Sequence, residues 1–188
     1  MTDMEECWIT TFTGKLFYPL RPRVEDVDIR DIAHALSNIC RFTGHCPKFY
    51  SVAQHSVIVS RCVSKENALW GLLHDASEAY ISDIARPVKH DPRLSIYTAF
   101  ELSIMAVVAE KYGLDVHEPQ EVKEVDAMVL RNEAKCFGML TCEWKHYDLP
   151  DLDIGILPME PELAEELFKD RFLELYFGVW SHGAADIQ

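Results

Sequence analysis

The sequence predicts an all-α protein, a helical bundle that carries a small β-hairpin at its N-terminal end. From Asp31 onward, apolar residues recur three and four positions apart, which is the spacing of amphipathic helices. Strand-like alternation is confined to residues 8–20, and Gly and Pro residues separate the helical segments. The 188 residues fit one domain, which we expect to span residues 1–188.

The first predicted elements are a hairpin and two helices. Residues 8–20 (WITTFTGKLFYPL) alternate β-forming residues around Thr13-Gly14, which predicts a two-residue hairpin turn. Residues 31–40 have the helical spacing, and the Gly and Pro of residues 44–47 end it. Ser51 predicts the start of a second helix, because its hydroxyl can accept a hydrogen bond from a free N–H group of the first turn.

Four more helices are expected further along the chain. The apolar spacing predicts helices over residues 66–80, 91–112, 121–137 and 160–176. Asp91 before Pro92 is a typical helix start, and Gly113 is a typical C-terminal cap. Residues 144–158 are rich in Pro, Asp and Gly, so we expect a loop there.

The charge of the chain bears on its partners. A formal net charge of -13 argues against a nucleic-acid polymer as partner, because such binding normally needs a basic stripe that displaces counterions from phosphates. A small anionic substrate needs only a local cluster of basic residues in a pocket. Candidates for that cluster are Arg41, Lys48, Arg86, Lys89 and Arg93.

Two further features bear on location. The sequence has no run of eighteen apolar residues, and its start, MTDMEECWITTF, lacks the basic and apolar regions of a signal peptide. We therefore expect a cytoplasmic protein without a membrane span.

The six cysteines form no CxxC pair, and several fall in apolar helical patterns. This favours reduced, buried thiols over disulfides or a cysteine-ligated zinc site.

Titratable residues occur at positions that should face the core. The stretch LLHDASEAY (72–80) carries His74, Asp75 and Glu78, and on a helix Glu78 would lie over both of the others. His55 shares a helical stripe with apolar residues, so its imidazole should point inward. Asp126 stands among valines three and four positions away, where an unpaired carboxylate would cost several kcal/mol or lose its charge.

A divalent cation would pair with all of these inward groups, because imidazole nitrogens and carboxylate oxygens are its usual ligands. The two histidines and two carboxylates come from three predicted helices. Zn, Mn, Co and Mg all accept such ligands, so the residue types leave the metal open. A buried network of salt bridges and hydrogen bonds is the alternative. It would favour an Arg or Lys among these positions, and the pattern contains none.

These residues resemble a known family. The order His55, His74-Asp75, Asp126 is similar to the H...HD...D motif of the HD-domain phosphohydrolases, an all-α superfamily. HDASE, with Asp83 and PVK after it, resembles the deoxyribonucleotide 5′-nucleotidases of that superfamily, as do SVAQHS and VKEVDA. IAHALSNICRFTGH resembles a related group that includes viral dATP triphosphohydrolases. The resemblance covers roughly residues 10–135.

The resemblance implies a role for each matched residue. It implies that one divalent metal ion is bound by four residues: His55, His74, Asp75 and Asp126. It implies that Glu78 is the catalytic carboxylate, handling a proton for the attacking water or the leaving oxygen. It also implies that Arg41 contacts the sugar and phosphate of the nucleotide. Asp83 would contact either the nucleotide or the catalytic water. Lys89 would neutralise phosphate.

Phe42 departs from the family, because the nucleotidases carry tryptophan at this position after the arginine. An aromatic platform for a base is retained, but base preference stays open. The remaining histidines are less informative: we expect His34 to be a satisfied core residue and His45 to approach the pocket. Four others are expected at the surface: His90, His117, His146 and His182.

The resemblance therefore implies an enzyme that cleaves the 5′ phosphoester of deoxyribonucleotides, with dATP or dAMP as substrate, and a homo-oligomer. One alternative is another HD-type enzyme, such as a guanosine polyphosphate hydrolase or a cyclic dinucleotide phosphodiesterase. The sequence contexts of HDASE, PVK and Arg41 disfavour both. The other alternative is an idle nucleotide-binding sensor, which would normally have lost a ligand.

Overall fold

The computed structural model describes residues 7–178 and confirms the all-α prediction, including the small hairpin. Strands β1 (Ile9–Thr10) and β2 (Leu16–Phe17) pair antiparallel. The connecting turn is longer than predicted. The N–H group of Gly14 donates to Thr11 O at 2.9 Å and Gly14 has a φ of 81°, so three residues form the loop and the glycine supplies its left-handed position.

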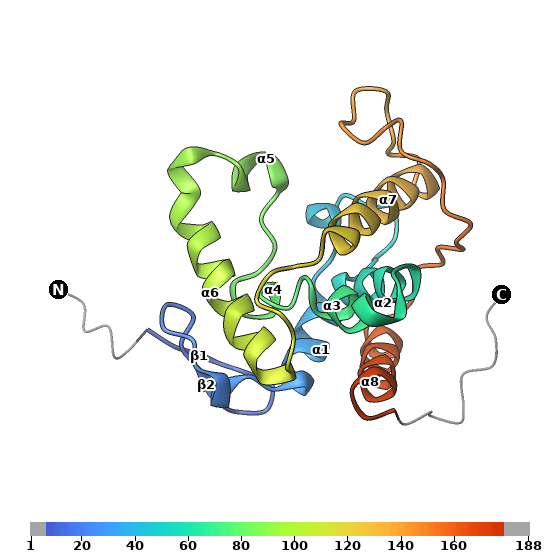
Figure 1. The fold of residues 1–188 in the computed structure, drawn as a ribbon. Coiled ribbons are helices and arrows are strands. Elements are labelled where there is room, and N and C mark those ends of the chain that lie inside the picture. The colour runs from blue at the N-terminus through green and yellow to red at the C-terminus, as the bar shows by residue number, and fades with distance from the viewer. Residues whose placement is uncertain (1–6, 179–188) are drawn as a thin grey trace.

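Eight α-helices follow in the described part of the chain (Figure 1). They are α1 (Ile29–Asn38), α2 (Val52–Cys62), α3 (Ala68–Leu73), α4 (Glu78–Ile81), α5 (Arg86–Lys89), α6 (Ser95–Tyr112), α7 (Gln120–Cys136) and α8 (Pro161–Phe177). Short 3-10 turns cover Val24–Asp26, Phe42–Gly44, Lys65–Asn67 and Pro92–Leu94.

The predicted ends of several helices are confirmed. Ser51 caps α2, its hydroxyl accepting from the N–H group of Gln54 at 3.1 Å. Asp91 accepts from the N–H group of Arg93 at the start of the turn that leads into α6, and Gly113 ends α6 in the left-handed conformation. Helix α1 starts two residues earlier than predicted, at the N-cap Asp28.

One predicted helix is interrupted. Residues 66–80 form α3 and α4 with a turn between them, where the N–H group of Ala76 donates to Leu73 O and that of Glu78 to Asp75 O. The side chain of His74 supplies a reason. Its Nδ1 lies 2.8 Å from Gly71 O, the carbonyl that an uninterrupted helix would pair with the backbone of Asp75. The prediction of one continuous helix was wrong at this point.

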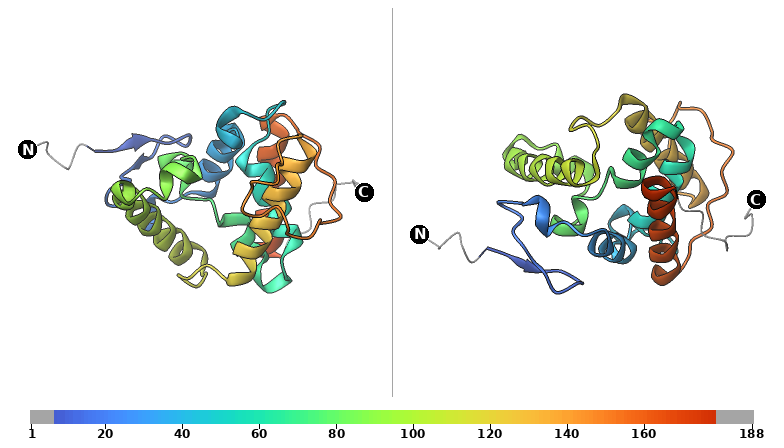
Figure 2. Two further views of the ribbon diagram at one scale, coloured as in Figure 1. Left: turned by 90° about the horizontal axis from the view of Figure 1, so that it is seen from above. Right: turned by 60° about the horizontal axis from the view of Figure 1, so that its bottom comes forward.

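Helix α2 is at the centre of the packing, in contact with α1, α3, α7 and α8. In Figures 1 and 2, α5 and α6 stand on one side of the molecule and α2, α7 and α8 on the other, with α3 and α4 between them. The apolar interior has two clusters, and Met105 and Leu114 pack against both. The turn between α3 and α4 therefore lies where the two sides meet.

Helix α6 bears on the expectation of a chain without a membrane span. Together with its preceding turn, Pro92–Tyr112, it is long and apolar enough to cross a membrane, though only at the margin of mean hydropathy, with 22% of the window buried. Its C-terminal half contributes Ile104 and Val108 to the core. Buried Glu101 is ion-paired with Lys89 at 2.7 Å. One such helix is weak evidence for a membrane span, because core helices of soluble proteins pass the same test.

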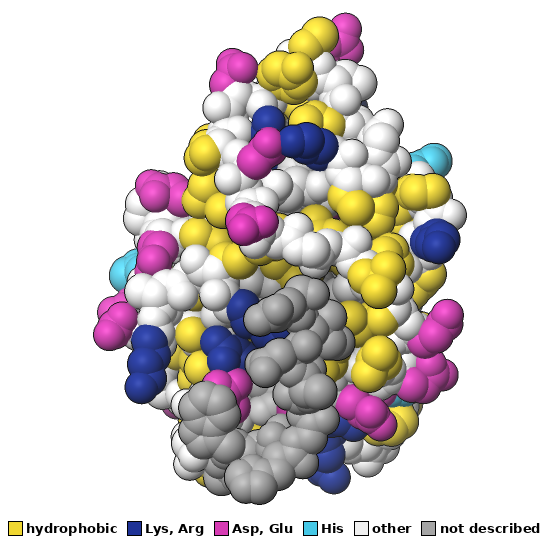
Figure 3. All heavy atoms as spheres, turned by 90° about the vertical axis from the view of Figure 1, so that its right-hand side faces the viewer, with side chains coloured by type: hydrophobic (Ala, Val, Ile, Leu, Met, Phe, Trp, Pro, Cys, Tyr) yellow, Lys and Arg dark blue, Asp and Glu magenta, His cyan; other side chains and the backbone are white. Residues whose placement is uncertain are grey.

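All six cysteines lie in the described residues and are free, as predicted. The expectation that they are buried was wrong: Cys7, Cys136 and Cys142 are exposed and the others are partly buried. Figure 3 shows one face of the molecule, where basic side chains are scattered among acidic and hydrophobic ones. The described part of that face has no continuous basic stripe.

Candidate metal centre and substrate cavity

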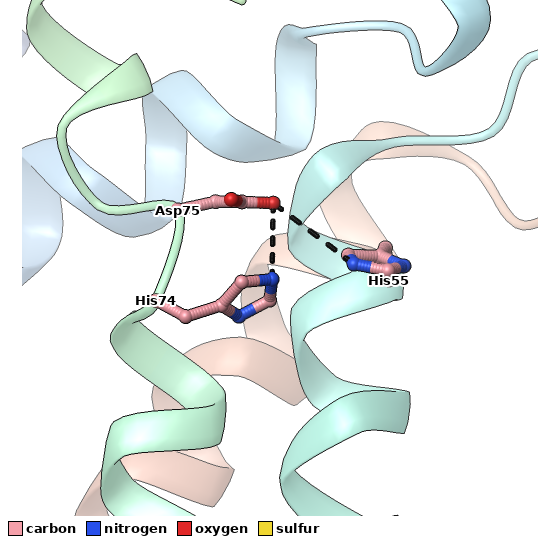
Figure 4. A group of neighbouring side chains, drawn as sticks. All are labelled: His55, His74 and Asp75. Atoms are coloured by element: carbon pink, nitrogen blue, oxygen red, sulfur yellow. Dashed lines mark ion pairs between the residues drawn. The ribbon is translucent and has the colours of Figure 1, made fainter. Parts of the chain in front are cut away.

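Two histidines from neighbouring helices meet at the turn after α3. His55 is the fourth residue of α2, and His74 and Asp75 come directly after α3; Figure 4 shows the three side chains together. The Asp75 Oδ2 atom lies 3.2 Å from His74 Nε2 and 3.9 Å from His55 Nε2. The helix interruption places Asp75 beside both rings.

Both imidazole rings are held with Nε2 toward the carboxylates. His55 Nδ1 lies 2.6 Å from Glu133 Oε1, and His74 Nδ1 lies 2.8 Å from Gly71 O. Because these oxygens only accept, each Nδ1 carries a proton, and in a neutral ring Nε2 is then a free lone pair. Both Nε2 atoms are buried and have no hydrogen-bond partner among the described residues. Two orphaned nitrogens of this kind fit a metal ion.

Asp126 of α7 lies beside both imidazole rings. Its Oδ1 atom lies 3.1 Å from His55 Nε2 and 3.9 Å from His74 Nε2. Two ligands about 2.1 Å from one ion can be at most about 4.2 Å apart, and these distances meet that limit. Ligand atoms of His55, His74 and Asp75 all lie within 4.8 Å of one another, so binding one ion needs only a small contraction.

The acid–base state of the cluster follows from its charges. Burial would lower the pKa of His74, but Asp75 outweighs it and raises the pKa to about 10. Burial would raise the pKa of Asp126, but His55 beside it brings it down to about 2. Without metal, a proton on His74 therefore balances the carboxylates, and a bound cation would take the place of that proton.

Two arginines also reach the carboxylates, which the sequence pattern did not anticipate. Arg41 Nη1 lies 3.7 Å from Asp75 Oδ2, and Arg86 Nη2 lies 3.6 Å from Asp126 Oδ2. The alternative of a buried ion-pair network thus has the cations that it needs. Neither arginine forms a hydrogen bond with the Nε2 atom of His55 or of His74. These two unpartnered nitrogens still favour a metal ion.

A cavity of about 560 Å³ opens directly over this cluster. Its walls include every predicted substrate or catalytic residue: Arg41, Phe42, Glu78, Asp83 and Lys89. Two of the four candidate metal ligands, Asp75 and Asp126, also line it. The structure therefore brings these residues together at one concave site, although they are spread along the chain from the turn at Phe42–Gly44 to helix α7.

Glu78 is poised to hold a proton. It is 8% exposed, and its Oε2 atom is buried with no hydrogen-bond partner in the described chain. Burial, and then repulsion by Asp75 and Asp83, raises its pKa well above the usual value. A protonated carboxyl beside a cavity is a candidate general acid.

Lys89 lines the cavity, but it is not a free cation. Its Nζ atom lies 2.7 Å from Glu101 Oε1, in an ion pair between α5 and α6. A phosphate at this end of the cavity would therefore share Lys89 with a carboxylate. Arg86, half exposed, is another cation on the same wall.

Phe42 lies in a strained turn. Phe42 and Thr43 both have positive φ, 54° and 53°, a region that non-glycine residues seldom adopt and that costs about 1–3 kcal/mol. In this turn the Arg41 guanidinium lies 5.8 Å from the centre of the Phe42 ring. The turn thus carries a cation and an aromatic ring together into the cavity wall.

The predicted loop after α7 also contributes to the cavity, which the sequence did not indicate. Trp144, Lys145 and His146 line the cavity, and the Trp144 ring lies 6.4 Å from that of Phe42, tilted by 49°. His146 Nε2 lies 3.5 Å from Arg86 Nη1. The sequence did contain a signal for this contribution: an aromatic residue followed by two basic ones, inside an otherwise acidic loop.

Other candidate residues lie elsewhere. Lys48 and Arg93 are not among the described residues that line the cavity, and exposed Arg93 pairs with Asp91. His45 is exposed and does not line it either, so it was wrongly expected near the pocket. His34 is satisfied by Glu165 at 2.9 Å and stacks on Phe12, but at 37% exposure it is no core residue.

Of the four histidines expected at the surface, His90 and His117 are exposed. His146 is partly buried in the cavity wall, and His90 also lines the cavity, so these two are closer to the site than expected. His182 lies outside the described residues.

Sequence reasoning also missed two buried partners of the cluster, Glu133 and Tyr50. Both are 0% exposed, and the Tyr50 hydroxyl donates to Glu133 Oε1 at 2.7 Å. Burial would raise the pKa of Glu133, but Arg41 and His55 keep it below the usual value. Glu133 follows Asp126 by seven residues, two helical turns along the same face, which was a usable signal.

The fold and this cluster define an all-α protein with a candidate metal centre at the base of a cavity. No protein-family model matches the chain. It is 41% identical over 171 residues to the Escherichia coli K12 protein named uncharacterized protein YfdR, covering 89% of this chain and 95% of that protein. It is 30% identical over 145 residues to uncharacterized protein RCAP_rcc00048 of Rhodobacter capsulatus, covering 70% of this chain and 74% of that protein. The chain belongs to the family of these two bacterial proteins, whose names state no activity.

Proposed function

We propose that this protein is a metal-dependent phosphohydrolase that cleaves the 5′ phosphoester of deoxyribonucleotides. One observation carries the proposal. Two buried histidine Nε2 atoms without a hydrogen-bond partner among the described residues, each directed by a hydrogen bond at Nδ1, face two carboxylates at the base of a cavity whose walls are rich in basic side chains. The similarity of the same residues to the HD-domain motif is the second support.

The proposed ligands are His55, His74, Asp75 and Asp126. When bound there, a divalent cation would act as a Lewis acid on a phosphoryl oxygen and lower the pKa of a coordinated water. The chain itself supplies the placement of these four groups. Its fixed tautomers keep both Nε2 atoms available without a rearrangement of either ring.

Glu78 is the proposed proton carrier. Burial, followed by repulsion from Asp75 and Asp83, raises the pKa of its carboxyl well above the usual value, and Glu78 lines the cavity in which the leaving 5′ oxygen would lie. Donation to that oxygen avoids the expulsion of an alkoxide. Asp83 lines the same cavity and, after burial and Asp75, also contributes to the raised pKa of Glu78.

The substrate's phosphates are proposed to lie against Arg41, Arg86 and Lys89. When a cation neutralises Asp75 and Asp126, the charge on Arg41 and Arg86 becomes available to an anionic substrate. Phe42 and Trp144 lie further along the wall and offer ring faces to a base. The adenine nucleotides dATP and dAMP are the proposed substrates on sequence resemblance.

We also propose a cytoplasmic location and a homo-oligomeric state, both of which the sequence led us to expect. Exposed apolar residues on α6 support self-association: Ile96 is 60% and Leu102 66% exposed.

The test is a screen of purified protein against all deoxy- and ribonucleoside mono- and triphosphates, with Mn²⁺, Co²⁺, Zn²⁺ or Mg²⁺ added. The expected result is hydrolysis of a deoxyadenosine nucleotide that stops after exhaustive chelation. Inorganic triphosphate from dATP would identify a triphosphohydrolase, and phosphate from dAMP a 5′-nucleotidase. Undiminished hydrolysis after chelation would contradict the proposal. So would no hydrolysis of any nucleotide, and that result would favour a nucleotide-binding sensor without catalytic activity.

A further inference from the structure

Glu133 is the most completely enclosed charged group at the site. It is 0% exposed and lies on α7, two turns beyond Asp126. A carboxylate at such a position costs several kcal/mol unless hydrogen bonds or opposite charges compensate it. Its neighbours supply this compensation.

Three groups surround the Glu133 carboxylate. On Oε1, His55 Nδ1 lies at 2.6 Å and the Tyr50 hydroxyl at 2.7 Å. On Oε2, Arg41 Nη2 donates at 3.0 Å. One of these partners is a proposed metal ligand and another a proposed substrate contact, so this single carboxylate joins both halves of the site.

The two histidines differ in how they are oriented. The Nδ1 of His74 is fixed by a backbone carbonyl, Gly71 O, whereas that of His55 is fixed by the side chain of Glu133. A carboxylate acceptor makes the opposite ring nitrogen a stronger donor to a metal than a carbonyl acceptor does. A side-chain substitution can therefore remove the group that orients His55, but not the backbone carbonyl that orients His74.

We propose that Glu133 is a positioning residue: it holds His55 with Nε2 toward the metal and holds Arg41 beside the substrate cavity. The inference rests on the proposed function, because it requires a metal at His55. Tyr50 fills the remaining hydrogen-bonding position on Oε1 and closes that side of the carboxylate. Glu133 is not among the described residues that line the cavity, so it acts through its two partners.

The test uses Co²⁺, whose visible absorption bands report ligand geometry, on wild-type protein and on Glu133→Gln. Glutamine keeps the shape and removes the charge. The substitution is expected to weaken Co²⁺ binding by about 10–100-fold and to shift the absorption bands. The KM for the hydrolysed nucleotide should also rise, because Arg41 loses its 3.0 Å ion pair with Glu133.

Asp31→Asn is the matched control. Asp31 is 3% exposed and accepts from the backbone and hydroxyl of Thr13, so it is a buried carboxylate outside the centre. This variant should bind Co²⁺ as the wild type does. If Glu133→Gln does not fold, Glu133→Asp keeps the charge but withdraws it by one methylene, and it should still bind Co²⁺ more weakly than the wild type.

The outcomes separate the two proposals. Wild-type protein that binds no Co²⁺ would contradict the proposed function itself. Wild-type protein that binds Co²⁺, with Glu133→Gln or Glu133→Asp binding it equally well and with unchanged bands, would overturn only the role of Glu133.

Discussion

At the scale of single residues, Glu78 is the side chain that distinguishes the proposed catalytic site from a site that only binds a ligand. Replacing Glu78 with glutamine removes the titratable proton but keeps the size of the side chain. We expect kcat to fall by about two to four orders of magnitude, the contribution of a positioned general acid, while metal content stays that of the wild type. Turnover and metal stoichiometry measured on the same preparation check this, and parallel loss of both would mean that Glu78 is a ligand.

Trp144 is the residue at which base recognition can be tested. Stacking of a base on an aromatic ring contributes about 1–3 kcal/mol, so Trp144→Ala should raise KM by roughly 10–100-fold with a smaller effect on kcat. Leu157→Ala is the control, because Leu157 lies in the same connecting segment and is 76% exposed. Steady-state kinetics that gave both variants the wild-type KM would remove Trp144 from the binding site.

The sequence predicted one part of the site well and another part poorly. His55 and Asp126 could be assigned because each stands among apolar residues on a regular helix, where periodicity fixes direction. Trp144 and His146 lie in a loop, and a loop has no periodicity from which the direction of a side chain follows. Glu133 had a helical position that pointed inward, but it is a supporting group, and the motif used for the assignment names only the ligands.

At the scale of elements, α1 provides a test that is independent of the metal. Its N-cap Asp28 accepts from the backbone N–H of Arg30 at 3.1 Å and pairs with Lys15 and Arg30 side chains. The hydrogen bonds from Arg30, together with Lys15, hold the pKa of Asp28 far below its usual value. Because the folded-state pKa is depressed, the stabilisation is present above the unfolded pKa of about 3.9 and is lost as pH falls through the folded-state pKa.

Asp28→Asn isolates this charge, because asparagine caps a helix about as well as aspartate does. We expect the variant to be about 0.5–1 kcal/mol less stable than wild type at pH 6, with the difference shrinking below pH 4. Urea unfolding at several pH values measures it. Glu25→Gln, at a side chain that is 70% exposed, should behave as wild type, and a pH-independent difference for Asp28→Asn would contradict the charge mechanism.

The predicted elements were most accurate where local signals mark an end. Ser51 and Gly113 mark helix boundaries that the structure confirms. The turn between α3 and α4 could not be foreseen, because apolar spacing continues through LLHDASEAY and the interruption depends on a side chain that takes a backbone acceptor. That local departure from a regular helix is also what places Asp75 beside both histidines.

At the scale of the whole molecule, the fold brings distant segments to one point. His55 on α2, His74 and Asp75 after α3, and Asp126 on α7 converge because α2 packs against both of the other helices. The all-α class followed from periodicity alone. The convergence depended on tertiary packing, which the sequence indicated only through the requirement that inward charges find partners.

If these four side chains bind one metal ion, anomalous diffraction from crystals grown with Mn²⁺ or Zn²⁺ will locate it. We expect one strong anomalous peak at about coordination distance from His55 Nε2, His74 Nε2 and the carboxylates of Asp75 and Asp126, and its loss in Asp126→Ala. Crystals of metal-activated protein with no peak between these residues would show that the four side chains do not form a metal centre.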